Sequence, residues 1–101
     1  MNRQEFIDGY LPEVYSRLCE LSSTKGREYA GTDDVLLNFK RLAERLYLEP
    51  RQVLSVYLTK HLDAIDSWVR CGIIYSEESI TGRIDDAILY LVLLRVMAGN
   101  N

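Results

Sequence analysis

The chain has 101 residues, of which 48% are hydrophobic, and its formal net charge is −3. This length corresponds to about one domain of typical size, and the composition is sufficient for a hydrophobic core. The acidic balance argues against a protein that coats duplex nucleic acid or an anionic membrane, because such proteins carry a basic stripe.

The first predicted helix covers residues 3–23, where apolar side chains recur every three or four positions. They are Phe6, Tyr10, Val14, Leu18 and Leu21. Pro12 lacks a backbone N–H, so we expect a kink or a restart of the helix near residues 10–11. Glycines and polar residues in segment 25–32 predict a loop after it.

Two further helices are predicted over residues 34–46 and 50–70. Thr32 or Asp33 is the expected cap of the first of these, while Pro50 suits the first turn of the second and Gly72 its end. The expected inward residues are Leu36, Phe39, Leu42, Ala43 and Leu46, then Leu54, Leu58, Leu62, Ile65 and Val69.

The last predicted helix ends at Gly99, with Ser76 as its cap and with Glu77 and Glu78 in its first turn. It is apolar on nearly every side. One face carries Ile80, Ile84, Ala87, Leu91 and Leu94, a second carries Leu89, Val92 and Val96, and Tyr90, Leu93 and Met97 nearly complete the circle.

A helix that is apolar all round must be covered on all sides, and the third helix also carries Val53, Val56 and Tyr57 away from its inward stripe. Three companions in so short a chain cover only part of this surface. We therefore expect an all-α fold, a four-helix bundle formed by a single helical domain, residues 1–101, that self-associates as a homo-oligomer.

Cys19 and Cys71 have no spacing typical of a zinc site, and we expect reduced thiols of a cytosolic protein. The first residues do not resemble a signal segment. The longest apolar run, residues 87–94, is far shorter than the roughly 20 residues that cross a bilayer. The expected location is the cytoplasm, which is the host's if the source is a virus, with no membrane partner.

Candidate chemistry rests on carboxylates and basic residues, because no nucleophilic triad or phosphate-binding glycine loop is readable. Asp63 and Asp66 share a helix face that is either solvated or part of a site. Asp85 and Asp86 interrupt the apolar last helix, where carboxylates need partners. Either such carboxylates hold a magnesium ion and through it phosphate, or neighbouring cations neutralise them. The cations in question are Arg83 and Lys60.

The remaining candidates have two interpretations each. His61 is expected to be a packed histidine with one hydrogen bond rather than a metal ligand. Lys25 and Arg27 can meet a phosphate or form part of a solvated surface. Three tyrosines can stack on a base or serve in core packing. They are Tyr29, Tyr57 and Tyr90.

One stretch of the sequence resembles a known family. It reads Lys-Gly-Arg-Glu-Tyr-Ala-Gly-Thr-Asp-Asp over residues 25–34 and is followed by Asn38-Phe39, by Thr59-Lys60-His61-Leu62 and by residues 78–90. These runs are similar to those of the nucleotide-modification-associated family of small phage and bacterial helical proteins. That family is related to the all-α MazG-like nucleotide pyrophosphohydrolases. The resemblance covers residues 25–94.

The resemblance implies that the four-helix bundle is antiparallel and oligomeric, with a magnesium-dependent pocket for a nucleotide phosphate. Carried over position by position, that pocket contains Lys25, Glu28, Tyr29, Asp34, Asn38, Lys60, Asp86 and Tyr90. The chain departs from the family where Glu28 replaces an aspartate and Leu89 an asparagine. The Glu-x-x-Glu pair by which MazG-like enzymes hold magnesium is not evident, since Glu13 and Glu20 are seven residues apart.

Three functions follow as hypotheses. The first is a magnesium-dependent nucleoside triphosphate pyrophosphohydrolase in which Asp63 and Asp86 are catalytic and hold the metal with Glu28. Its phosphate- and nucleotide-binding residues are Lys25, Arg27, Tyr29, Asn38, Lys60 and Tyr90. The second is a binder without turnover that sequesters a nucleotide or a cyclic-nucleotide signal of host defence. The third is a helical interaction or structural protein without a small ligand.

Overall fold

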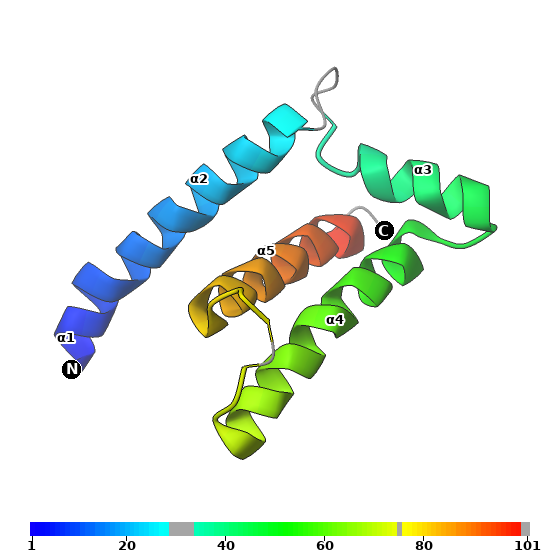
Figure 1. Cartoon of the computed structure of the whole chain (residues 1–101). Helices are drawn as coiled ribbons and strands as arrows, with labels where there is room; N and C mark the ends of the chain where they lie inside the picture. The colour runs from blue at the N-terminus through cyan, green and yellow to red at the C-terminus, as the bar shows by residue number, and fades with distance from the viewer. Residues whose placement is uncertain (29–33, 75, 100–101) are drawn as a thin grey trace. The chain divides into compact units, whose positions relative to one another are not determined.

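The computed structural model of the chain describes residues 1–28, 34–74 and 76–99, with the backbone alone for residues 24–28. The contacts divide the chain into two compact units, Met1–Gly31 and Thr32–Asn101. Every regular element of the described ranges is a helix, which confirms the all-α class (Figure 1). No helix of these ranges is long and apolar enough to cross a membrane.

The first unit is a continuous run of three helical elements, α1 (Arg3–Glu5), η1 (Phe6–Tyr10) and α2 (Leu11–Glu28). The side chain of Asn2 begins the run by accepting a hydrogen bond from the backbone of Glu5 at 2.8 Å. The turn η1 is π-helical and ends where a kink or restart was predicted. Pro12 cannot donate to the carbonyl of Asp8 and its ring crowds that oxygen, which explains an interruption at this point.

The helix α2 continues past the predicted end at residue 23 and includes the first part of the predicted loop. The extra turn contains Lys25, Arg27 and Glu28, which are good helix formers, and the single Gly26 between them does not end the helix. The predicted loop therefore begins too early.

The second unit begins with α3 (Leu37–Leu46). The Asp34 carboxylate accepts hydrogen bonds from Lys40 Nζ at 2.7 Å and from the backbone of Leu36 at 2.9 Å. These bonds, the first more than the second, hold the pKa of the Asp34 carboxyl below its usual value. The predicted caps, Thr32 and Asp33, lie outside the described residues.

The start and the end of α4 (Pro50–Cys71) confirm the prediction for this helix. Pro50 occupies its first position, and the side chain of Gln52 accepts a hydrogen bond from the backbone N–H of Glu49 at 2.8 Å. At the other end Gly72 has a φ of 68°, and its N–H donates to the carbonyl of Trp68 at 2.7 Å. A left-handed residue of this kind ends a helix at little cost when it is glycine.

The last helix, α5 (Ile80–Gly99), ends as predicted but has a different cap. The hydroxyl of Ser79, and not that of Ser76, accepts a hydrogen bond from the backbone of Gly82 at 3.0 Å. Glu77 and Glu78 consequently lie before the helix and not in its first turn. Both serines precede the apolar run, so the spacing alone did not distinguish them.

Ser79→Ala is expected to lower the free energy of unfolding by about 1 kcal/mol, because it removes the acceptor of an otherwise unpaired helix N–H. Ser76→Ala is the matched control and should change it by less than about 0.5 kcal/mol. Urea unfolding followed by circular dichroism measures both changes. A larger loss for Ser76→Ala would contradict the assignment of the cap.

The helices α4 and α5 pack side by side in the second unit (Figure 1). Tyr57 meets Tyr90, and four positions further along α4 His61 meets Asp86. The residue number rises along α4 while that of its partner on α5 falls, so the two helices run antiparallel. The helix α3 packs on α4.

The core of the second unit is formed by residues of all three helices and by Leu36. It contains Leu36, Phe39, Ala43, Val53, Leu54, Leu58 and Ala87. Val53 is buried although it was predicted to lie off the inward stripe. Three residues predicted to face inward are 46–66% exposed, namely Leu46, Leu62 and Val69. The core thus occupies the part of α4 near α3, where three helices meet, and not the whole length of α4.

Candidate functional site

Charged side chains gather between α4 and α5 near the loop that joins them. His61 of α4 and Asp86 of α5 face one another, with Nδ1 and Oδ2 3.9 Å apart and side chains only 14% and 15% exposed. Glu78 approaches from the loop, so that one possible ligand atom from each of these three residues lies within 4.8 Å of the others. We refer to His61, Glu78, Arg83 and Asp86 as the His61 cluster.

Arg83 is the cation of the His61 cluster. Its Nε lies 2.8 Å from a carboxylate oxygen of Glu78, and its two Nη atoms lie 3.3 Å from His61 Nδ1 and 3.4 Å from the hydroxyl of Ser76. The Nε–H is buried and is not aligned with an acceptor, although the Glu78 oxygen is close enough for an ion pair. The guanidinium therefore neutralises Glu78 and bridges the loop to the imidazole.

The contact with Arg83 is matched by one tautomer of the His61 ring. An arginine only donates hydrogen bonds, so Nδ1 accepts from Arg83 in the tautomer whose proton lies on Nε2. The Asp86 oxygen lies 3.9 Å from the same Nδ1, which is longer than a hydrogen bond. In this tautomer the lone pair of Nδ1 is directed toward Arg83.

Aromatic rings continue from the His61 cluster toward α3. The rings of His61 and Tyr90 are 5.5 Å apart, Tyr90 is nearly parallel to Tyr57 at 6.3 Å, and Phe39 meets both tyrosines edge-on at 6.2 Å. Half-buried tyrosines combine an apolar face with a polar tip. Charged and aromatic groups therefore lie next to each other at one helix–helix junction.

The structure brings two of the predicted site residues, Asp86 and Tyr90, to this junction. Lys60 is exposed on α4 beside His61 in sequence, and Asn38 is half-buried in the first turn of α3 next to Phe39.

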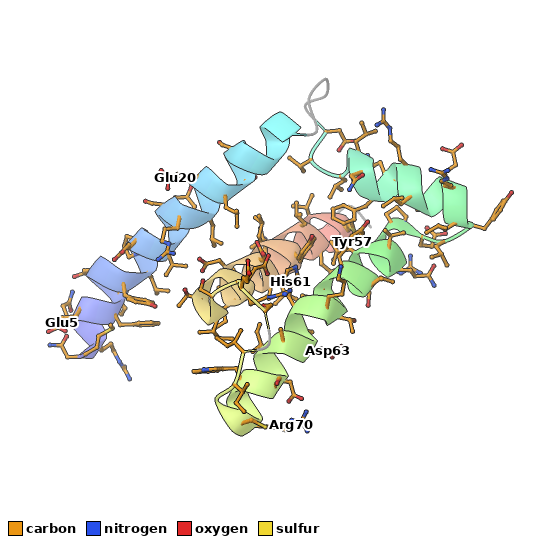
Figure 2. All side chains as sticks on the ribbon, in the orientation of Figure 1. Glu5, Glu20, Tyr57, His61, Asp63 and Arg70 are labelled. Atoms are coloured by element: carbon orange, nitrogen blue, oxygen red, sulfur yellow. The ribbon has the colours of Figure 1, made fainter. Side chains whose placement is uncertain are left out.

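Asp63 is not brought to the His61 cluster. It is two residues from His61, and this separation is about 200° around an α-helix. It lies on an exposed face of α4 with Asp66, whose carboxylate pairs with Arg70 at 3.1 Å (Figure 2). This face agrees with the interpretation of a solvated polar surface.

The remaining predicted residues belong to the end of α2 and to the segment after it. Tyr29 lies outside the described residues, and the side chains of Lys25, Arg27 and Glu28 lie outside the described side chains. Their part in a site stays a prediction.

His61 was expected to be a packed histidine with one hydrogen bond, and its half-buried ring beside Arg83 agrees with that expectation. Its proximity to Asp86 and the pairing of Glu78 with Arg83 were not predicted from the sequence. One signal was available for α5, because Arg83, Asp86 and Tyr90 follow at intervals of three and four residues and share a stripe with the buried Ala87. No such signal existed for Glu78, since it precedes the helix and its position depends on the loop.

Comparisons with models of protein families, with curated proteins and with solved structures find no match for the chain. The function is therefore inferred from the site itself and from the resemblance in residues 25–94.

Proposed function

We propose that the chain binds a nucleotide at the His61 cluster and hydrolyses it as a magnesium-dependent nucleoside triphosphate pyrophosphohydrolase. The observation that carries this proposal is the convergence of Arg83 and Asp86 beside the ring of Tyr90, with His61 between them. A phosphate needs N–H donors, a cation needs carboxylates and a base needs aromatic surface. The junction of α4 and α5 supplies all three kinds of group.

The roles follow from the chemistry of each side chain. Arg83 and Lys60 would donate to phosphate oxygens, and Tyr90 would stack on the base. Asp86 and Glu78 would hold magnesium, because carboxylate oxygens are its preferred protein ligands. A magnesium ion bound there would supply an activated water. Hydrolysis would form a bond from the water oxygen to the α-phosphorus and break the bond from that phosphorus to the oxygen that bridges the α and β phosphates. The products would be a nucleoside monophosphate and pyrophosphate.

A second candidate function is sequestration without turnover. In the structure Glu78 is already neutralised by Arg83 at 2.8 Å, so one of the two carboxylates has a cation from the protein itself. The sequence adds that Leu89 stands in place of an asparagine and that the Glu-x-x-Glu pair is not evident. In this case the chain would hold a nucleotide or a cyclic-nucleotide signal of host defence intact, at an interface between subunits.

Both candidates include self-association of the chain as an antiparallel four-helix bundle in the cytoplasm. Support comes from apolar residues on the outer side of α5 that are still 42–50% exposed. They are Leu91, Val92 and Val96. A second copy of the chain would remove this surface from water. Sedimentation velocity measures the subunit number directly.

The test is an incubation of the purified protein with linear and cyclic nucleotides and magnesium, followed by filtration and chromatography. Monophosphate and pyrophosphate in the filtrate are expected for the hydrolase. An intact nucleotide recovered only after the protein is denatured would instead establish sequestration. If every nucleotide stays free and unchanged, both proposals are wrong and the hypothesis of a helical interaction or structural protein without a small ligand is left.

Two arginine variants locate the site. Arg83→Gln is expected to weaken nucleotide retention about tenfold or more, because a hydrogen bond to a charged group contributes about 1.5–3 kcal/mol. Arg70→Gln is the matched control, since Arg70 is an exposed, ion-paired arginine of α4. Equal losses in both variants would point to unspecific attraction of phosphate.

A further inference from the structure

The geometry points to a binding site for a transition-metal dication at His61, Glu78 and Asp86, with Arg83 taking the place of the ion when none is bound. The possible donors are an imidazole nitrogen and the carboxylate oxygens of two residues, all within 4.8 Å of one another. Three protein ligands with a fourth position left for water or substrate are typical of catalytic zinc sites. The site shares its residues with the proposed nucleotide site, but binding of the ion does not require the nucleotide.

The imidazole decides which ion the site prefers. Magnesium demands oxygen ligands in nearly ideal octahedral geometry, whereas imidazole nitrogen suits zinc, cobalt and nickel. In the tautomer that accepts a hydrogen bond from Arg83, the lone pair of His61 Nδ1 is directed into the cluster, as a metal ligand requires. We therefore expect zinc or cobalt to bind more tightly than magnesium, while the oxygens of Glu78 and Asp86 still allow magnesium to occupy the same position when it is the ion supplied.

The distances require only small movements. His61 Nδ1 and Asp86 Oδ2 are 3.9 Å apart, and two ligands of a tetrahedral ion are separated by about 3.3 Å. Both residues belong to packed helices and are less than one-sixth exposed, so their positions are held by the α4–α5 contact. Glu78 lies in the loop with a side chain that is 56% exposed, so it can shift to complete the set once Arg83 releases it.

Arg83 occupies the space that the ion needs. Its guanidinium pairs with Glu78 and contacts the lone pair of His61, so two of the three ligands are engaged by one positive charge. A dication would attract the same groups and repel the guanidinium. The released Arg83 would remain next to the ion and could meet an anion bound to it. This last step, in which the anion is a nucleotide phosphate, rests on the proposed function.

The test is a titration of the protein with Co²⁺ in the absence of nucleotide, followed by visible absorption and by calorimetry against Mg²⁺. His61→Ala and Glu78→Gln are expected to weaken Co²⁺ binding about tenfold or more. Arg83→Gln should tighten it about tenfold, because the competing charge is gone. The exposed carboxylate of Asp66 provides the control, and Asp66→Asn should leave binding unchanged.

Several outcomes would overturn the site. They are a Co²⁺ affinity unchanged by both ligand variants, a weaker affinity in Arg83→Gln, a preference for Mg²⁺, and an absorption band of thiolate-to-cobalt charge transfer that shows binding by Cys19 or Cys71. Glu78→Gln alters an exposed loop residue and keeps the experiment valid even if His61→Ala unfolds, which circular dichroism reveals. Normal Co²⁺ binding together with no nucleotide retention would contradict the proposed function alone.

Discussion

Leu54→Ala is expected to lower the free energy of unfolding of the second unit by about 2–5 kcal/mol. Leu54 is 0% exposed and lies in the core that α3, α4 and α5 share. The substitution removes buried methyl and methylene groups and leaves a cavity that the packed neighbours fill only in part. Because small domains are stable by only about 5–15 kcal/mol, this is a large fraction of the total. Chemical unfolding followed by circular dichroism measures the change.

Leu62→Ala is the matched control for this prediction. It makes the same chemical change on the same helix, but Leu62 is 46% exposed. Less apolar surface is lost and no closed cavity forms, so a decrease below about 1 kcal/mol is expected. Equal effects of the two substitutions would mean that Leu62 is covered as well, as the helical spacing alone predicts.

Asp86→Asn is expected to abolish hydrolysis, with a rate at least about a hundredfold lower, while the fold is retained. The amide has nearly the shape of the carboxylate but lacks its charge, so it cannot hold a cation opposite His61. Release of pyrophosphate from a nucleoside triphosphate measures the rate, and thermal unfolding checks the fold.

Asp66→Asn controls for the loss of one negative charge, since Asp66 is 61% exposed and pairs with Arg70 on the outer face of α4. Its rate should equal that of the unchanged protein. A normal rate in Asp86→Asn would remove this residue from the catalytic machinery. Asp63→Asn distinguishes the two proposed sets of metal ligands. It should lower the rate only if the set predicted from the sequence, which includes Asp63, is the correct one.

The ends of the helices were predictable wherever one residue type determines them. Pro50 and Gly72 mark the start and the end of α4 because one lacks an N–H and the other adopts a positive φ easily. Ser76 and Ser79 have the same capping chemistry, so the start of α5 depended on the path of the loop. Gly26 lies within α2, where its neighbours favour the helix.

The candidate site was predictable only in part for a related reason. Periodicity indicates which residues share a face of one helix, such as Asp86 and Tyr90, which are four residues apart and both lie beside His61. It does not give the rotation of α4 against α5, which decides that His61 and not Asp63 faces Asp86. The position of Glu78 depends on a loop and on its ion pair with Arg83, neither of which leaves a periodic pattern.

The antiparallel pairing of α4 with α5 also has a consequence for folding. The two helices are consecutive in the chain and are joined by a short connection, so their pairing requires the closure of only one short loop. The entropy lost on closing so short a loop is small. Because His61 and Asp86 belong to the two paired helices and Glu78 to the connection between them, the step that forms the hairpin also brings the His61 cluster together.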